Sequence, residues 1–218
     1  GYTGSYSRVA AFARVWKAQC HAAEQTTGRG VFVPLVFGAG EAFQFDWSED
    51  WAVIAGVRTK LQVAHFKLSH SRAFYLRAYP LQTHEMLFDA HNHAFAVFGG
   101  IPRRGIYDNM RTAVDRVGRG KLREVNARFS AMASHFLFEA EFCNPASGWE
   151  KGQVEKNVQD ARRRVWPAVP QHFKHLDELN AWLEKRCKAL WQALPHPEQR
   201  QRRNAEVLQD DREAPIHA

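Results

Sequence analysis

Hydrophobic and polar residues alternate along residues 42–46, and further runs rich in β-branched and aromatic side chains follow at 52–57, 61–68 and 73–78. Alternation with a period of two is typical of β-strands that bury one face. Because only short polar breaks separate these runs, they predict an antiparallel meander of consecutive strands. In this interpretation Asp46 lies at the end of the first strand.

Other segments show apolar residues at the spacing of an amphipathic helix. They are residues 7–25, 84–98 and 176–194. Residues 126–135 also look helical, and residues 150–166 carry Lys151, Glu155, Val158 and Arg162 at helical spacing, as a mixed face of cations and a carboxylate. The segment 84–98 is the most clearly bounded, since Pro80 precedes it and Gly99 and Gly100 follow its last apolar residue. We therefore expect an α/β fold in which helices flank a sheet.

Two shorter strands complete the predicted sheet. Residues 105–107 precede Asp108, and residues 136–143 also have a strand-like pattern. Because a helix separates residues 105–107 from the meander, we expect this strand to return parallel to the first strand through a right-handed crossover. The prediction is a sheet of about five strands in which Asp46 and Asp108 lie side by side.

The 218 residues divide by composition into three parts. Residues 1–30 are expected to form an N-terminal helix or linker, and residues 31–194 a single α/β domain with its C-terminal helices. Residues 195–218 are charged and contain proline, which predicts a linker or a poorly ordered tail. Because the chain begins with Gly1 rather than Met, we expect a fragment of a longer protein.

The charge of the chain favours a polyanionic partner. The formal net charge is +7 and the pI is about 9.5, although charge alone does not decide function. Cys20, Cys143 and Cys187 are scattered, which argues against a disulfide framework or a zinc knuckle. No apolar run approaches the roughly 20 residues of a membrane span, and no signal-peptide pattern is present. We therefore expect a cytoplasmic protein.

Three carboxylates are the candidate catalytic residues. Asp46 and Asp108 each follow a predicted strand, and Glu155 lies in the early turns of the helix after the Pro/Gly/Ser loop at 144–150. Carboxylates from separate elements can converge on a divalent ion, and their hard oxygen atoms suit Mg²⁺ or Mn²⁺. Asp50 is expected to lie in a turn and not to be a ligand.

Simpler interpretations exist for some of these residues. His91 and His93 could be taken for metal ligands, but residues two apart on a helix face different ways. The helix that carries Glu155 could be an ordinary surface helix, because Lys151 precedes Glu155 at the spacing of an i,i+4 ion pair.

Cations and amides around the three carboxylates are candidate DNA contacts. Basic residues crowd the segment 103–123, and others lie on the helix that carries Glu155. Such contacts to phosphate position DNA and supply much of its affinity, although a basic run is also typical of a solvated surface. The candidates are Lys151, Lys156, Asn157, Arg162, Arg104, Arg111, Arg119 and Lys121.

Three short motifs, in this order, resemble the Asp-Asp-Glu catalytic core of retroviral integrases and bacterial insertion-sequence transposases. They are Phe45-Asp46-Trp47-Ser48, then Tyr107-Asp108-Asn109-Met110, then Asn144-Pro145 followed by Gly152-Gln153-Val154-Glu155-Lys156. A single acid is a weak signal, whereas three in this order and context are specific. The residues around each acid are most similar to those of IstA-type transposases, and the resemblance covers residues 32–191.

The resemblance implies a ribonuclease-H-like fold, with a mixed five-stranded sheet whose first three strands are antiparallel. It implies two Mg²⁺ or Mn²⁺ ions, with Asp46 on both ions, Asp108 on one and Glu155 on the other. The implied reaction is metal-dependent hydrolysis at the 3′ ends of a transposon, followed by transfer of the strand into target DNA. Because the interval from Asp108 to Glu155 is longer than in retroviral integrases, we expect inserted structure around residues 116–123.

The implied partners are double-stranded DNA, further copies of the chain assembled on that DNA, and a companion AAA+ ATPase. The implied location is the bacterial cytoplasm, with association with the nucleoid when the protein is on DNA. IstA-type proteins are expected to carry further DNA-binding regions on both sides, so we expect an isolated catalytic core. Two other functions stay open, namely a catalytically silent DNA-binding or assembly module on the same fold and a plain ribonuclease-H-like nuclease.

Overall fold

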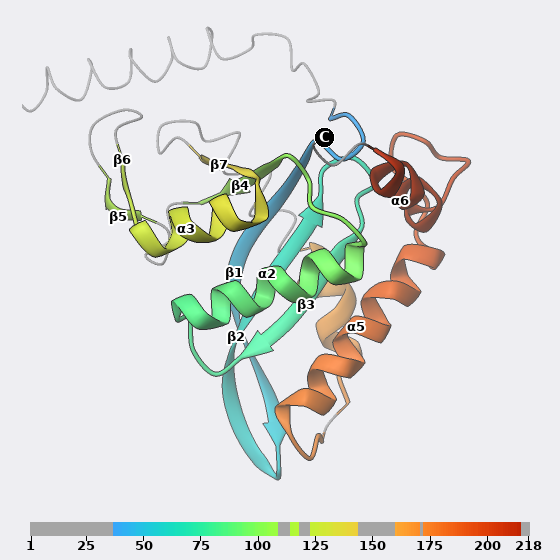
Figure 1. Cartoon of the computed structure of the whole chain (residues 1–218). Helices are drawn as coiled ribbons and strands as arrows, with labels where there is room; N and C mark the ends of the chain where they lie inside the picture. Colours follow the sequence, from blue (N-terminus) through green and yellow to red (C-terminus); the bar gives the residue numbers. More distant parts are fainter. Residues whose placement is uncertain (1–36, 109–113, 118–122, 144–159, 171, 215–218) are drawn as a thin grey trace, which may run out of the picture. The chain divides into compact units, whose positions relative to one another are not determined.

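A mixed β-sheet of five strands forms the centre of the structure (Figure 1). In chain order its strands are β1 (Ala42–Ile54), β2 (Val57–Leu68), β3 (Phe74–Tyr79), β4 (Arg104–Tyr107) and β7 (Glu139–Phe142). Their order across the sheet is β3-β2-β1-β4-β7. The first three strands pair antiparallel, whereas β4 pairs parallel with both β1 and β7. The predicted α/β class and the predicted mixed sheet are confirmed.

The computed structural model describes residues 37–108, 114–117, 123–143, 160–170 and 172–214. The predicted N-terminal helix at 7–25, the loop at 144–150 and the first turns of the helix around Glu155 lie outside these ranges. Across the described ranges, every helix is too short or too polar to cross a membrane.

Helices and a small hairpin surround the sheet. The α-helices are α2 (His84–Phe98), α3 (Ala127–Phe136), α5 (Leu176–Ala193) and α6 (Asn204–Glu213). Residues 160–165 are also helical and lead into the 3₁₀ turn η1 (Trp166–Ala168). β5 (Val114–Val117) and β6 (Arg123–Val125) pair as a separate antiparallel hairpin. This hairpin lies where the sequence predicts inserted structure between Asp108 and Glu155.

Aromatic rings form the core between α2 and one face of the sheet. Alternation along β1 directs Phe43 and Phe45 to this face, where they contact Phe66 of β2 and Tyr107 of β4. α2 packs His91 against the same rings. Residues of β1 with even numbers therefore lie on the other face of the sheet.

β1 is longer than the sequence pattern predicts. The run at 52–57 is not a separate strand, because β1 continues to Ile54 and passes into β2 through Ala55 and Gly56. Both turn residues have positive φ, 50° and 82°, which matches a two-residue hairpin turn. The error arises because Ser48, Glu49 and Asp50 look like a polar break, although backbone pairing with β2 keeps this stretch extended.

Because β1 is longer than predicted, two aspartates have positions that differ from those the sequence predicts. Asp46 is inside β1 rather than at its end, although it directly follows the part that pairs with β4, Ala42–Phe45. Asp50 is not in a turn. It lies in β1, on the same side of the strand as Asp46, and it is buried.

α5 covers the open edge of the sheet. β3 is the outermost strand at that edge, and the side chain of Asn180 bonds both backbone groups of Ala78. Its Oδ1 accepts from the Ala78 N–H at 2.7 Å, and its Nδ2 donates to the Ala78 carbonyl at 3.0 Å. Trp191 donates from Nε1 to the carbonyl of Phe74 at 2.8 Å. The helix thus satisfies backbone groups that would otherwise face solvent as a free strand edge.

The C-terminal segment differs from the linker or poorly ordered tail that its composition predicts. Residues 204–213 form α6, which buries Ala205, Val207 and Leu208. The prediction from composition fails here because this segment has few apolar residues, and many of the contacts between α6 and the rest of the fold are polar. The carboxylate of Asp211 accepts from the backbone N–H of Gly40 at 2.8 Å and from that of Ser71 at 3.2 Å.

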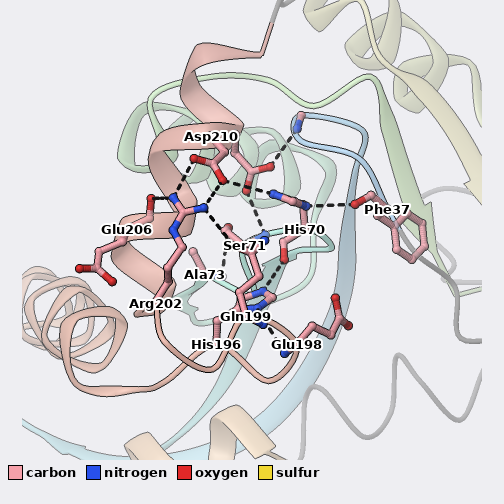
Figure 2. Close-up of polar contacts among 12 residues, drawn as sticks. Phe37, His70, Ser71, Ala73, His196, Glu198, Gln199, Arg202, Glu206 and Asp210 are labelled. Carbon is pink, nitrogen blue, oxygen red and sulfur yellow. Dashed lines mark hydrogen bonds and ion pairs between the residues drawn. The ribbon is translucent and has the colours of Figure 1, made fainter.

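A network of side chains holds the loop before α6 (Figure 2). Arg202 donates from both terminal nitrogens to the carboxylate of Asp210, at 2.6 and 2.8 Å. The Nδ1 atom of His196 accepts from the backbone N–H of Gln199, so its Nε2 carries the proton and donates to the carbonyl of His70 at 2.9 Å. The loop and α6 therefore form part of the folded unit.

Candidate active site

The pairing of β1 with β4 brings two predicted site residues into register. The parallel pairing includes Phe45 opposite Tyr107, and Asp46 and Asp108 are the next residues of the two segments. Because Phe45 and Tyr107 both contact the aromatic core beneath α2, alternation places the two aspartates on the other face. Both aspartates are partly exposed. They therefore occupy neighbouring positions where the parallel pairing of the two strands ends.

The backbone around Asp46 also helps to fix its side chain. Oδ1 of Asp46 accepts a hydrogen bond from the backbone N–H of Trp47 at 2.8 Å. The rotamer of a carboxylate held in this way is restricted.

Gly105 allows β1 and β4 to approach closely just before the two aspartates. A Cβ atom at Gly105 would lie 2.6 Å from Cζ of Phe43 and 2.7 Å from Cε2 of Tyr107. Any larger residue would push these two rings apart. The spacing of the strands that carry Asp46 and Asp108 thus depends on the packing of aromatic rings behind them.

His91 supports the strand that leads to Asp108. Its Nδ1 lies 2.7 Å from the carbonyl of Leu87, and its Nε2 lies 2.8 Å from the hydroxyl of Tyr107. The carbonyl can only accept, so Nδ1 carries the proton and Nε2 accepts from Tyr107. Burial lowers the pKa of His91 to about 4, and the ring is fully buried. In this setting His91 is a structural residue of the core.

The third predicted acid lies outside the described residues. Glu155 belongs to the range 144–159, as do Lys151, Lys156 and Asn157 among the predicted DNA contacts. Arg111, Arg119 and Lys121 also lie outside the described ranges. The roles of all these residues stay predictions.

The two described candidates for DNA contact are engaged in ion pairs within the chain. Arg104 bonds Glu141 at 2.8 Å and also pairs with Glu41. Arg162 bonds Asp50 at 2.7 Å. Their charges are partly neutralised by these carboxylates, which weakens the argument that they bind phosphate.

A second polar cluster, which the sequence does not predict, lies on the same face of the sheet as Asp46. Asp50 accepts from Arg162 through Oδ1 and from the Ser48 hydroxyl through Oδ2, the latter at 3.4 Å. The Ser48 hydroxyl lies 2.7 Å from Nε2 of His65. His65 pairs directly with Asp46 across β1 and β2. The spacing of residues 46, 48 and 50 signals one shared face, but their partners come from distant parts of the chain.

Burial governs the ionisation of this cluster. Desolvation, together with the positive charge of Arg162, lowers the pKa of His65 to about 3. Desolvation raises the pKa of Asp50, while the hydrogen bonds from Arg162 and Ser48 act in the opposite direction. His65 is therefore neutral at physiological pH.

The donor atoms at this face fit a hard divalent cation. Asp46 and Asp108 bring carboxylate oxygens, which Mg²⁺ and Mn²⁺ prefer. Among the described residues, no three His, Cys, Asp or Glu side chains cluster closely enough to hold a metal ion. A further ligand would have to come from outside the described ranges, where Glu155 lies, or from substrate.

Known proteins similar in sequence to this chain are transposases. A transposase of Aminobacter aminovorans is 72% identical over 200 residues, which cover 92% of this chain and 39% of the relative. The transposase for insertion sequences IS1326/IS1353 of Pseudomonas aeruginosa is 69% identical over 198 residues, 91% of this chain and 39% of the relative. The chain thus spans about two-fifths of the length of these curated relatives. No protein-family model matches the chain.

The transposase of insertion sequence IS21 of Pseudomonas aeruginosa is a more distant relative. It is 32% identical over 171 residues, which cover 76% of this chain and 44% of the relative. These relatives confirm the predicted resemblance to insertion-sequence transposases.

Solved structures with a similar fold include retroviral integrases. The catalytic core domain of HTLV-2 integrase, solved in complex with magnesium, matches with a TM-score of 0.56 and 13% identity, covering 79% of this chain and 99% of that domain. A chain of the simian T-cell lymphotropic virus intasome matches with a TM-score of 0.61 and 12% identity, covering 84% of this chain and 60% of that chain. At this identity the likeness concerns the fold, and it confirms the predicted ribonuclease-H-like class.

Proposed function

Because this chain belongs to the insertion-sequence transposases and has the fold of an integrase catalytic core, we propose that it is the catalytic core of a DNA transposase. The proposed reaction is metal-dependent hydrolysis at the 3′ ends of a transposon and transfer of the strand to target DNA. The observation that carries the proposal is the register of β1 and β4, in which Asp46 and Asp108 follow directly paired residues.

Each acid has a defined task in this proposal. Asp46 and Asp108 would hold divalent ions from two neighbouring strands, and Glu155 would supply a third carboxylate from the helix that follows. When bound, two such ions supply Lewis-acid stabilisation of the attacking and leaving oxygens. The aromatic core behind β1 and β4 keeps the strands rigid, so the two aspartates stay in place while the substrate changes.

The partners of this core follow from the proposed reaction. Double-stranded DNA would bind along the face that carries the aspartates, where phosphate approaches carboxylates only if cations neutralise them. Assembly of several copies on paired DNA ends and the action of a companion AAA+ ATPase remain proposals that rest on the resemblance to IstA-type transposases.

The test compares metal binding and strand cleavage in the 218-residue chain and in Asp46→Asn, Asp108→Asn and Glu155→Gln. Mn²⁺ binding is measured by calorimetry with and without DNA, and cleavage on a branched duplex that mimics the product of strand transfer. Each substitution is expected to weaken Mn²⁺ binding and to slow cleavage by about 100-fold or more, since each removes a ligand of the proposed ions.

Asp177→Asn is the matched control, because it removes an exposed carboxylate in the first turn of α5. Circular dichroism verifies that every variant stays folded. If the three acid variants bind Mn²⁺ and cleave DNA as well as the control does, the proposed site is wrong. DNA binding without any metal-dependent cleavage would instead support the silent module.

A further inference from the structure

One ion pair connects the strand of Asp46 to the helical segment 160–165. The Nε and Nη2 atoms of Arg162 both lie 2.7 Å from Oδ1 of Asp50. The carboxylate is 4% exposed, whereas the guanidinium side chain is 50% exposed. Ala161 and Val165 of the same segment are buried in the hydrophobic core. The pair thus joins a buried acid of β1 to a helical turn that is already packed against the sheet.

The pair continues as a chain of hydrogen bonds toward Asp46. Ser48 donates its hydroxyl hydrogen to Asp50, so the Ser48 oxygen accepts from Nε2–H of His65. Nδ1 of His65 is then an acceptor, and it is buried with no partner among the described residues. Since His65 is the cross-strand partner of Asp46, the network reaches from Arg162 to the immediate neighbour of a proposed metal ligand.

We propose that Asp50 and Arg162 form a clamp that positions β1 and the helical segment 160–165 for the reaction at Asp46, and that Arg162 is a positioning residue rather than a DNA contact. The inference rests on the proposed function. In the sequence, Arg162 follows Glu155 by seven residues. The clamp therefore fixes the chain shortly after the third proposed acid.

The neighbours of Arg162 allow a direct comparison. Arg163 and Arg164 are exposed, and the structure gives neither of them a carboxylate partner among the described residues. An arginine that binds DNA through phosphate contributes affinity and salt dependence, whereas an arginine that positions a strand contributes rate. Removing the charge of a DNA-binding arginine should therefore raise the Kd for DNA, whereas removing the charge of a positioning arginine should lower the reaction rate.

The first measurement is thermal unfolding of Asp50→Asn, Arg162→Gln and the double variant. Arg162→Gln leaves a buried carboxylate without its cation, so we expect the midpoint to fall by roughly 5–10 °C. Asp50→Asn leaves a half-exposed guanidinium that water can solvate, so the fall should be smaller. The double variant should recover at least half of the loss caused by Arg162→Gln, because no buried charge remains unpaired.

The second measurement is cleavage of the branched duplex at saturating DNA, together with the Kd for DNA. Asp50→Asn, Arg162→Gln and the double variant should each lower the single-turnover rate by about 10-fold or more, while the Kd changes less than about 3-fold. The double variant separates the two effects, since its stability recovers and its rate does not. Arg162→Lys, which keeps the cation, should restore much of the rate.

Arg163→Gln and Arg164→Gln are the matched controls, and they should weaken DNA binding without lowering the rate at saturation. An Arg162→Gln variant that weakens DNA binding as they do, with an unchanged rate, would overturn the clamp. So would a double variant less stable than Arg162→Gln alone. If Asp46→Asn still cleaves DNA, the proposed function fails by itself, and the unfolding measurements still test the ion pair.

Discussion

At the scale of single residues, the pair of His91 and Tyr107 links α2 to the strand before Asp108. Both side chains are fully buried among aromatic rings, and each satisfies a polar atom of the other. A buried polar atom that loses its partner costs roughly 1–3 kcal/mol, whereas the loss of both partners costs much less. The pair should therefore behave as a unit.

Replacing this pair should change the stability of the protein in acid. The pKa of His91 falls from 6.5 to about 4 on folding, so the unfolded chain binds more protons between these values and stability is lost as the pH falls through this window. The expected loss from His91 is about 3 kcal/mol. The double variant His91→Phe/Tyr107→Phe should show a shallower loss, measured by urea unfolding at about pH 7 and about pH 4.5.

His65 contributes to the acid loss in the same direction, because burial also lowers its pKa. The double variant should therefore reduce the slope without abolishing it. His172→Gln tests whether removal of any imidazole has this effect, since His172 is exposed. An unchanged acid slope in the double variant would contradict the assignment of His91 as a buried neutral group.

At the scale of elements, α5 acts as a cover for the free edge of β3. A helix usually packs against a sheet through apolar side chains, and α5 does so through Leu179 and Leu183. Asn180 adds a different contact, since one amide group pairs both backbone atoms of Ala78 as a neighbouring strand would. At Ala78, a side chain therefore satisfies both hydrogen-bonding groups of the strand edge.

Asn180→Ala should destabilise the fold by about 2–3 kcal/mol, because it leaves a buried backbone donor and a buried acceptor without partners. The free energy of unfolding is measured by urea denaturation. Lys185→Ala, at an exposed position of the same helix, should change it by less than about 0.5 kcal/mol. Equal effects of the two substitutions would show that the amide contributes nothing specific.

The sequence predicts elements well where local signals bound them. α2 has the predicted range, because Thr83 accepts from the N–H of Met86 at its start and Gly99 ends it. The interior position of Asp46 in β1 was not predictable, since the strand continues only because β2 pairs with it. The ion pair of Asp50 with Arg162 was missed for a similar reason, because 112 residues separate the two side chains.

At the scale of the whole molecule, α6 forms hydrogen bonds with parts of the fold that are distant in sequence. Arg212 donates from Nε to the carbonyl of Phe98 at the end of α2, and Asp211 reaches Gly40 before β1. These partners are more than a hundred residues away in sequence, so the charged composition of the segment predicts solvent exposure and gives no sign of the contacts. Tertiary contacts, rather than local sequence signals, therefore make α6 part of the fold.

Removing the buried face of α6 should therefore lower the stability of the whole protein. Leu208→Ala is expected to cost about 2–5 kcal/mol, because Leu208 is buried against the core. Gln209→Ala, at the exposed neighbouring position, is the control and should be nearly neutral. Urea unfolding and limited proteolysis both report the effect. If Leu208→Ala unfolds like the control, α6 is not part of the cooperative unit.

The hydrogen bond between Asp211 and Gly40 also brings the two ends of the described unit together. A Cβ atom at Gly40 would lie 2.8 Å from the Cβ of Ala214, so the chain begins and ends its compact part at almost the same point. A unit of this kind can in principle be circularly permuted, with its ends joined by a short peptide and a new opening made at an exposed turn such as that between β1 and β2.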